Sequence, residues 1–247
     1  GLRNIDLIAD KQKEDKALAN FIQSNTALKA KYGTLMSDID KHYQLVFTDA
    51  ERELWFNNLY TGIRTYQIAN LINKLKIETA KKGTVAQKNE YFNKNIALVK
   101  KELDAVYESY NVDADQKIAA NMFAQAYNLK DKNVIQTIAN KNFKSADAAG
   151  SYIAQNIANS KLNTKEKLYK EVLNNEATLL AYDDEILKSQ QQFAHEPAPF
   201  NQELTRREGV LNKLMGDYVA VKEIYQDKSF IPDANSTLRL TFGNIKG

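Results

Sequence analysis

The chain of 247 residues carries 34 basic and 31 acidic side chains, a formal net charge of +3, and no cysteine. The lack of cysteine excludes disulfides, thiol nucleophiles and Cys-ligated zinc or iron–sulfur sites. The two charge signs alternate along the sequence without the concentrated basic patch that nucleic-acid or anionic-membrane binding needs, and no apolar run reaches the ~18–20 residues of a membrane span.

Nine glycines and three prolines are few for this length, so long helices are expected instead of a loop-rich β fold. The first helix is predicted to run from about Ile5 to Tyr32. Gly33 is expected to end it in the left-handed conformation that glycine adopts readily. A second helix follows to about Val46.

Thr48 and Glu51 have the spacing of a capping box and therefore predict the start of a long helix. This helix is expected to end near Gly83. The next amphipathic stretch, about 86–109, places apolar residues at intervals of three and four and predicts a further long helix.

Shorter helices are predicted at about 114–127, 131–140, 146–158 and 164–173, and a longer one at about 175–194. Asp113 with Gln116, and Asn163 with Glu166, have the three-residue spacing of helix caps. The segment from His195 to Pro199 is the sharpest break among the predicted helices. This break and the first helix are our hinge candidates, because turn chemistry concentrates there.

The final helix, about 200–226, is predicted to carry an apolar stripe that repeats every seven residues. The stripe requires one long partner helix, for which about 86–109 or 51–82 would serve. Its members are Leu204, Leu211, Leu214, Tyr218, Val221 and Tyr225.

After Pro232 the pattern changes to strict alternation: Leu238, Leu240 and Phe242 share one face of a predicted β-strand. A single strand leaves its backbone groups unpaired, so its partners are expected outside this sequence. The fold class is therefore all-α, a multi-helix array with one C-terminal strand that pairs elsewhere, and the chain is expected to be part of a larger protein.

Residue chemistry favours no catalytic, cofactor-binding or metal-binding residue in the chain. Asp38 and His42 lie one helical turn apart, but a closed metal site needs three or four ligands, so a solvated pair is the better interpretation. His195 is interpreted as a turn residue. The acidic clusters at 51–53 and 183–185 are interpreted as solvated helix faces. Sequences typical of a nucleophile elbow or a phosphate-binding loop are absent.

Three stretches of the sequence resemble one family. They are Lys29–Gly33 with the following Asp38–Asp40, the stretch Glu51–Phe56, and the C-terminal block Phe230–Gly247. Together they are similar to the helical insert of the bacterial serine dipeptidyl-peptidases typified by dipeptidyl-peptidases 7 and 11. The resemblance follows the whole chain in order and is most specific in the C-terminal block.

The resemblance implies a helical cap domain over residues 1–235 and a segment over 236–247 that re-enters a chymotrypsin-like double β-barrel. It implies that the serine-protease triad lies outside this sequence, so that the cap itself is inert. It further implies an oligopeptide substrate cleaved into dipeptides from its free N-terminus, the catalytic barrel as a partner in cis, a homodimer, and a periplasmic or cell-surface location in a Gram-negative bacterium. Neither a cofactor nor a nucleic-acid partner is implied.

A different class of function is compatible with the helices alone: a stand-alone binding or scaffold domain that uses its helix grooves for a protein partner. An open reading frame that continues past Gly247 into a Gly-Asn-Ser-Gly motif favours the peptidase. The preference for acidic or apolar residues at the second substrate position stays open in this sequence.

Overall fold

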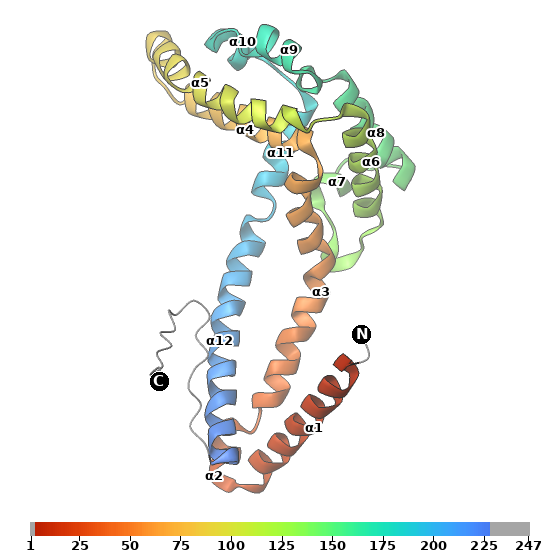
Figure 1. Ribbon diagram of the computed structural model, residues 1–247, viewed down its shortest axis with the longest axis vertical. Helices are drawn as coiled ribbons and strands as arrows, with labels where there is room; N and C mark the ends of the chain where they lie inside the picture. Colours follow the sequence, from red (N-terminus) through yellow and green to blue (C-terminus); the bar gives the residue numbers. More distant parts are fainter. Residues whose placement is uncertain (1–2, 228–247) are drawn as a thin grey trace, which may run out of the picture. The chain divides into compact units, whose positions relative to one another are not determined.

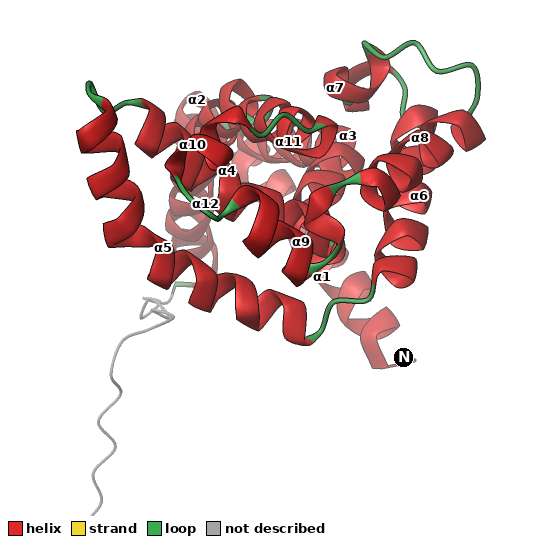
Figure 2. Cartoon of the chain, turned by 90° about the horizontal axis from the view of Figure 1, so that it is seen from above, coloured by secondary structure: helices red, strands yellow, loops and turns green. Residues whose placement is uncertain are grey.

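The computed structural model describes residues 3–227, which form helices and connecting loops without a β-strand in that range (Figure 2). This confirms the all-α, multi-helix class. The strand predicted around Leu238 to Phe242, and with it the segment 236–247, lies outside the described residues. The described residues divide into two compact units, one formed by 3–43 with 206–227 and the other by 44–205. None of the helices in 3–227 is both long and apolar enough to cross a membrane.

The first unit is built from α1 (Arg3–Ser24), α2 (Thr26–Tyr32), the beginning of α3 (Leu35–Gly62) and the end of α12 (Ala198–Gln226). The described residues of this unit form a small core of six buried apolar side chains: Leu18, Ile22, Tyr32, Leu35, Tyr218 and Val221. Tyr218 and Val221 thus pack against α1, and the predicted partner for this part of the stripe, 86–109 or 51–82, was wrong. The Tyr218 hydroxyl donates to Asp15 at 2.8 Å.

The second unit contains the remaining helices, which Figure 1 colours according to their position in the sequence. Its regular helices of more than four residues, besides its parts of α3 and α12, are α4 (Arg64–Ala80), α5 (Val85–Glu108), α6 (Val112–Asn128), α8 (Ala146–Asn159), α10 (Glu176–Ala181) and α11 (Glu185–His195). Its shorter pieces are η1 (Asp131–Asn133), α7 (Gln136–Ala139), η2 (Lys161–Asn163), α9 (Lys165–Lys167) and the π-helical η3 (Leu168–Val172).

One large hydrophobic core holds this second unit together. Helix α6 packs along α8, α4 packs along α5, and α11 packs on α4 (Figure 1). An aromatic cluster of Trp55, Tyr66, Phe123 and Phe193 joins α3, α4, α6 and α11, with ring centroids 5.3–6.4 Å apart. Each large apolar side chain that is fully buried contributes about 1.5–3 kcal/mol to folding, so this core supplies most of the unit's stability.

The N-terminal helices differ from the prediction in two ways. A single helix over 5–32 was wrong, because Asn25 adopts an extended conformation and its side chain caps α2 through the amides of Ala27 and Leu28. Gly33 is right-handed, with φ −58°. Glycine is required there for space: a Cβ at Gly33 would lie 2.5 Å from the Lys29 carbonyl oxygen.

The predicted start of a helix at Thr48 was also wrong. Helix α3 runs through this position, and the Thr48 hydroxyl donates back to the Gln44 carbonyl at 2.8 Å. The break occurs instead at Ile63, which is extended and offers no side-chain cap to α4. A Ser or Thr hydroxyl bonded to the preceding turn is compatible with a continuous helix. The spacing of Thr48 and Glu51 therefore does not distinguish the start of a helix from its interior.

The caps of the shorter helices are displaced from their predicted positions. Asn111, two residues before Asp113, caps α6 through the Ala114 amide at 2.9 Å. Asn163 caps no helix, because its side-chain amide donates to the Ala158 carbonyl. The predicted helix over 175–194 is divided in two, and Asp184 caps the second half, α11.

Candidate functional site

An apolar hollow of the second unit lies between α3 and α6. We call it the Trp55 groove; it measures about 390 Å³. Its lining residues follow helical spacing on both sides, so each helix presents one face to it. They are Glu51, Leu54, Trp55 and Asn58 from α3, and Met122, Gln125, Asn128 and Leu129 from α6 and the residue that follows it.

Trp55 fixes the base of this groove. Its indole Nε1 donates to the Met122 carbonyl oxygen at 2.8 Å, and only 5% of the residue is exposed. Its ring also meets Phe193 at 5.3 Å between centroids. The tryptophan is therefore held by a hydrogen bond and by the core, which gives the groove a rigid apolar wall.

The groove combines this apolar wall with a polar rim. Leu54 is 62% exposed and lies at the opening. The amides of Asn58, Gln125 and Asn128 each offer a donor and an acceptor, and Glu51 adds a carboxylate. Apolar surface with a few convergent polar groups is typical of ligand sites, and side-chain amides match the alternating N–H and C=O groups of a peptide.

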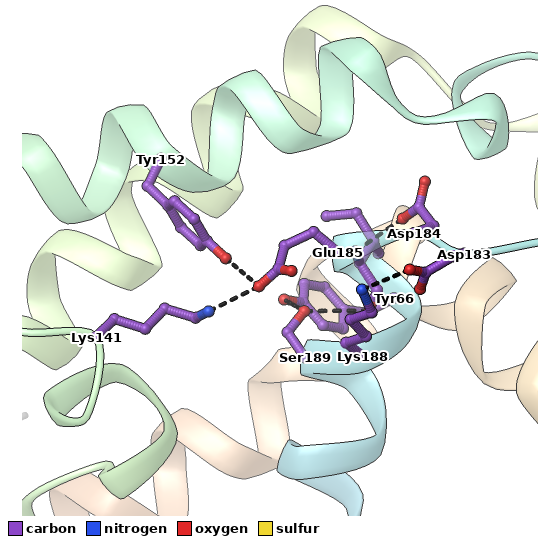
Figure 3. A network of polar contacts seen from close by, with 9 residues as sticks. Tyr66, Lys141, Tyr152, Asp183, Asp184, Glu185, Lys188 and Ser189 are labelled. Carbon is purple, nitrogen blue, oxygen red and sulfur yellow. Dashed lines mark hydrogen bonds and ion pairs between the residues drawn. The ribbon is translucent and has the colours of Figure 1, made fainter.

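A second polar constellation centres on Glu185, at the beginning of α11 (Figure 3). Lys141 Nζ lies 2.7 Å from Glu185 Oε1, and the Tyr152 hydroxyl donates to the same oxygen. Burial opposes ionisation of Glu185, but the hydrogen bonds from Lys141 and Tyr152 outweigh it and lower its pKa. The carboxylate is thus held ionised, as a structural contact between α8, α11 and the loop after α7.

Glu185 belongs to the acidic cluster predicted as a solvated face; its side chain is 37% exposed, but its carboxylate is also bound by Lys141 and Tyr152. The neighbouring Asp183 fits it better: its side chain is 72% exposed and pairs with Lys188 at 2.8 Å (Figure 3). Nearby, the Ser189 hydroxyl donates to the Ile186 carbonyl at 3.1 Å, so the buried Tyr66 hydroxyl is the donor to Ser189 at 2.8 Å. Every group in this network has an internal partner, which leaves none aimed at a ligand.

The two histidines occupy different environments. His42 is 7% exposed, so the solvated interpretation was wrong for its ring, which meets Tyr43 edge-on at 5.9 Å. Asp38 does lie at the surface, with its carboxylate 3.4 Å from Lys41 Nζ. His195 is exposed at the end of α11 and lines a polar hollow with Lys141 and Glu196. Within 3–227 no three His, Asp or Glu side chains gather as a metal site.

Comparison with known proteins identifies the family. The model of the family described as Peptidase S46 matches residues 1–247. The chain belongs to the peptidase S46 family. A relative named dipeptidyl-peptidase 7, from Capnocytophaga gingivalis, is 25% identical over 219 residues, which cover 88% of this chain and 30% of the relative. The chain thus spans about a third of the length of this peptidase S46 relative.

The groove was not predicted from the sequence, although part of one wall comes from the stretch Glu51–Phe56. Glu51, Leu54, Trp55 and Asn58 have the i, i+3, i+4, i+7 spacing of one helix face, and this was the available signal. Their opposite wall is some 70 residues further along the chain. No local pattern indicates which helix faces α3, so the groove became visible only with the fold.

Proposed function

We propose that this chain is the helical lid of a serine dipeptidyl-peptidase and that the Trp55 groove contacts the peptide substrate. The family match over residues 1–247 is the observation that carries the proposal. The relative's name, dipeptidyl-peptidase 7, supports dipeptide release as the activity of the whole protein. The alternative, a stand-alone scaffold, has no comparable support.

The groove supplies what a lid needs in order to hold a peptide. An extended peptide presents side chains alternately with backbone N–H and C=O groups. The wall formed by Trp55 and Met122 accepts an apolar side chain, while Asn58, Gln125 and Asn128 are placed to bond backbone groups. Binding there orders the peptide, and lid closure excludes water from the reaction.

The remaining parts of the proposal follow the resemblance. The lid comprises residues 1–235, and 236–247 returns to a catalytic β-barrel in cis. The barrel supplies the catalytic triad, so none of the catalytic residues lies in this chain. The whole protein is a homodimer located in the periplasm or at the cell surface, and its substrate is an oligopeptide with a free N-terminus.

Trp55 is the only tryptophan in the sequence, so its fluorescence reports directly on the groove. We expect the tetrapeptide Ala-Leu-Ala-Leu to shift the emission of the chain in a saturable way. Leu54→Asp places a charge at the apolar opening and should weaken binding at least tenfold. Leu98→Asp is the matched control, because Leu98 on α5 is 59% exposed, like Leu54, and does not line the groove.

Equal binding by the Leu54→Asp and Leu98→Asp variants would exclude the groove as the peptide contact. The same pair, introduced into the intact protein, tests the lid role. Release of dipeptides by the intact Leu54→Asp protein should show a raised KM, with the Leu98→Asp protein unchanged. Hydrolysis of dipeptidyl substrates by the isolated 247-residue chain would contradict the assignment of the chain as lid alone.

A further inference from the structure

The corner between α11 and α12 is the feature that the family does not explain. Helix α11 ends at His195, and the Glu196 amide still donates to the Gln192 carbonyl at 3.0 Å. Helix α12 begins at Ala198, after two intervening residues, and the Asn201 amide donates to the Pro197 carbonyl at 2.7 Å. Proline-flanked breaks of this kind are flexible unless other contacts hold them, and the sequence made this one a hinge candidate.

The Glu196 side chain holds a neighbouring helix. Its two oxygens accept the amides of Gln136, at 2.6 Å, and Thr137, at 3.0 Å. These are the first amides of α7, whose own cap residue, Ile135, provides no side-chain acceptor. A single helical turn nucleates poorly, and a carboxylate at its N-terminus makes strong, charge-assisted hydrogen bonds. Helix α7 therefore depends on a residue some 60 positions further along the chain.

Arg52 of α3 closes the contact from the other side. A guanidinium nitrogen lies 3.7 Å from Glu196 Oε1, and the guanidinium carbon lies 5.4 Å from the ring centroid of Phe56 and 4.9 Å from that of Phe200. The Arg52 amide donates to the Asn133 side chain at 3.3 Å. The ion pair joins α3 to the corner, and the hydrogen bond to Asn133 and the ring contact with Phe200 tie Arg52 to the segment before α7 and to the beginning of α12.

Burial distinguishes this ion pair from the others of the unit. The Arg52 and Glu196 side chains are 15% and 9% exposed, whereas those of Lys188 and Asp183 are 54% and 72% exposed. An exposed pair contributes little, but a buried carboxylate that loses its partner leaves an uncompensated charge or open amides. Opening the corner would separate Glu196 from Arg52 and from the α7 amides, leaving the carboxylate and these amides without their partners.

We propose that Glu196 and Arg52 form a latch that fixes the direction in which α12 leaves α11. The corner at 195–200 is then a rigid joint, not the hinge that its prolines indicate, and α7 through Thr205 moves as one piece. The latch concerns the internal rigidity of the second unit, so it stands or falls independently of the peptide groove.

Spin labels across the corner test the latch, and the cysteine-free sequence allows them to be placed at will. Lys188→Cys on α11 and Thr205→Cys on α12 report the corner, and both positions are exposed. Lys74→Cys with Lys188→Cys is the reference pair, since α4 packs against α11 without crossing the corner. In the otherwise unchanged chain, both pairs should give narrow distance distributions.

Glu196→Gln removes the charge and one acceptor, and should broaden the corner distribution at least twofold without affecting the reference pair. It should also speed hydrogen exchange at the Gln136 and Thr137 amides at least tenfold. Glu102→Gln, at an exposed position of α5, is the control and should change neither measurement.

An unchanged corner distribution in the Glu196→Gln chain would overturn the latch, as would a broad one in the unsubstituted chain. If both pairs broaden together, Glu196 serves general stability and the proposal is wrong. Should the Glu196→Gln chain fail to fold, Arg52→Lys keeps the charge but loses the stacked guanidinium. That variant should broaden the corner alone, and a narrow corner in the folded Arg52→Lys chain would equally reject the latch.

Discussion

Asp115 shows how a single residue replaces a missing local cap. It belongs to α6, but its carboxylate accepts the Arg64 amide at 2.6 Å and the Thr65 amide at 2.9 Å, at the beginning of α4. The Thr65 hydroxyl donates to it as well. Asp115 is only 3% exposed, and burial raises its pKa above the ordinary value, which its hydrogen bonds offset only in part.

This pKa direction sets the sign of a pH effect. The folded chain binds the Asp115 proton more tightly than the unfolded chain, so this residue's contribution to stability is largest below its ordinary pKa and falls as pH rises through the raised pKa. Asp115→Asn cannot ionise, and its NH₂ leaves one backbone amide without an acceptor, at a cost of about 1–3 kcal/mol. The gap in unfolding free energy between wild type and this variant should therefore narrow from acid to neutral pH.

Urea unfolding followed by Trp55 fluorescence, from about pH 3.5 to about pH 7, measures this gap. Asp113→Asn is the control, because Asp113 lies in the same helical turn but is exposed. A gap that widens toward neutral pH would show that the hydrogen bonds, and not burial, dominate the ionisation of Asp115.

Caps also mark the limit of prediction from sequence at this scale. A local cap requires a residue within three positions of the amides it binds, so the sequence can indicate it. For α6 the prediction missed the cap residue by only two positions, Asn111 instead of Asp113. Asp115 is 51 residues from Arg64, and Glu196 is 60 from Gln136. No spacing rule connects residues so far apart, so the breaks that they stabilise at α4 and α7 were missed.

Among the elements, α6 and α8 share the most extensive helix–helix contact of the second unit. Gly150 of α8 permits it, because a Cβ there would lie 2.8 Å from the Ala120 carbonyl oxygen of α6. The backbone of a packed helix cannot move aside without disturbing its other contacts. Gly150→Ala should therefore lower the unfolding free energy of the unit by about 1–3 kcal/mol. Gly62→Ala is the matched control: its nearest neighbour is the flexible Met122 thioether at 3.3 Å, and the change should stay within about 1 kcal/mol.

Urea titration with Trp55 emission compares the two alanine variants, since both sites and the tryptophan belong to one unit. Equal destabilisation by Gly150→Ala and Gly62→Ala would contradict close α6–α8 packing. Two of the long helices were predictable from their periodicity: α5 and α12 confirm the helices predicted over 86–109 and 200–226 within two residues. The helices that pack against them were not predictable. An apolar stripe indicates that one face of a helix is buried, but it does not identify the element that covers this face.

The molecule has two units whose hydrophobic cores differ in size, and this division was not predicted from the sequence. The sequence reads as one succession of helices, and the chain passes from one unit to the other at 43–44 and at 205–206, within α3 and α12, where nothing interrupts the helical pattern. Among residues 3–227, the buried apolar cluster of the first unit has six members, whereas that of the second unit has 26. Since stability follows buried apolar area, the first unit should unfold at a lower urea concentration.

Two probes separate these transitions. Trp55 follows the second unit alone, while circular dichroism follows the helices of both, so the circular-dichroism change should begin before the fluorescence change. Leu18→Ala removes a core side chain of the first unit and should advance the early phase, at a cost of about 2–5 kcal/mol, with the fluorescence midpoint unchanged. Leu162→Ala, in the other core, should move the fluorescence midpoint instead. Coincident curves that both variants shift together would mean that the chain unfolds as a single cooperative body, and the small core would then draw its stability from the large one.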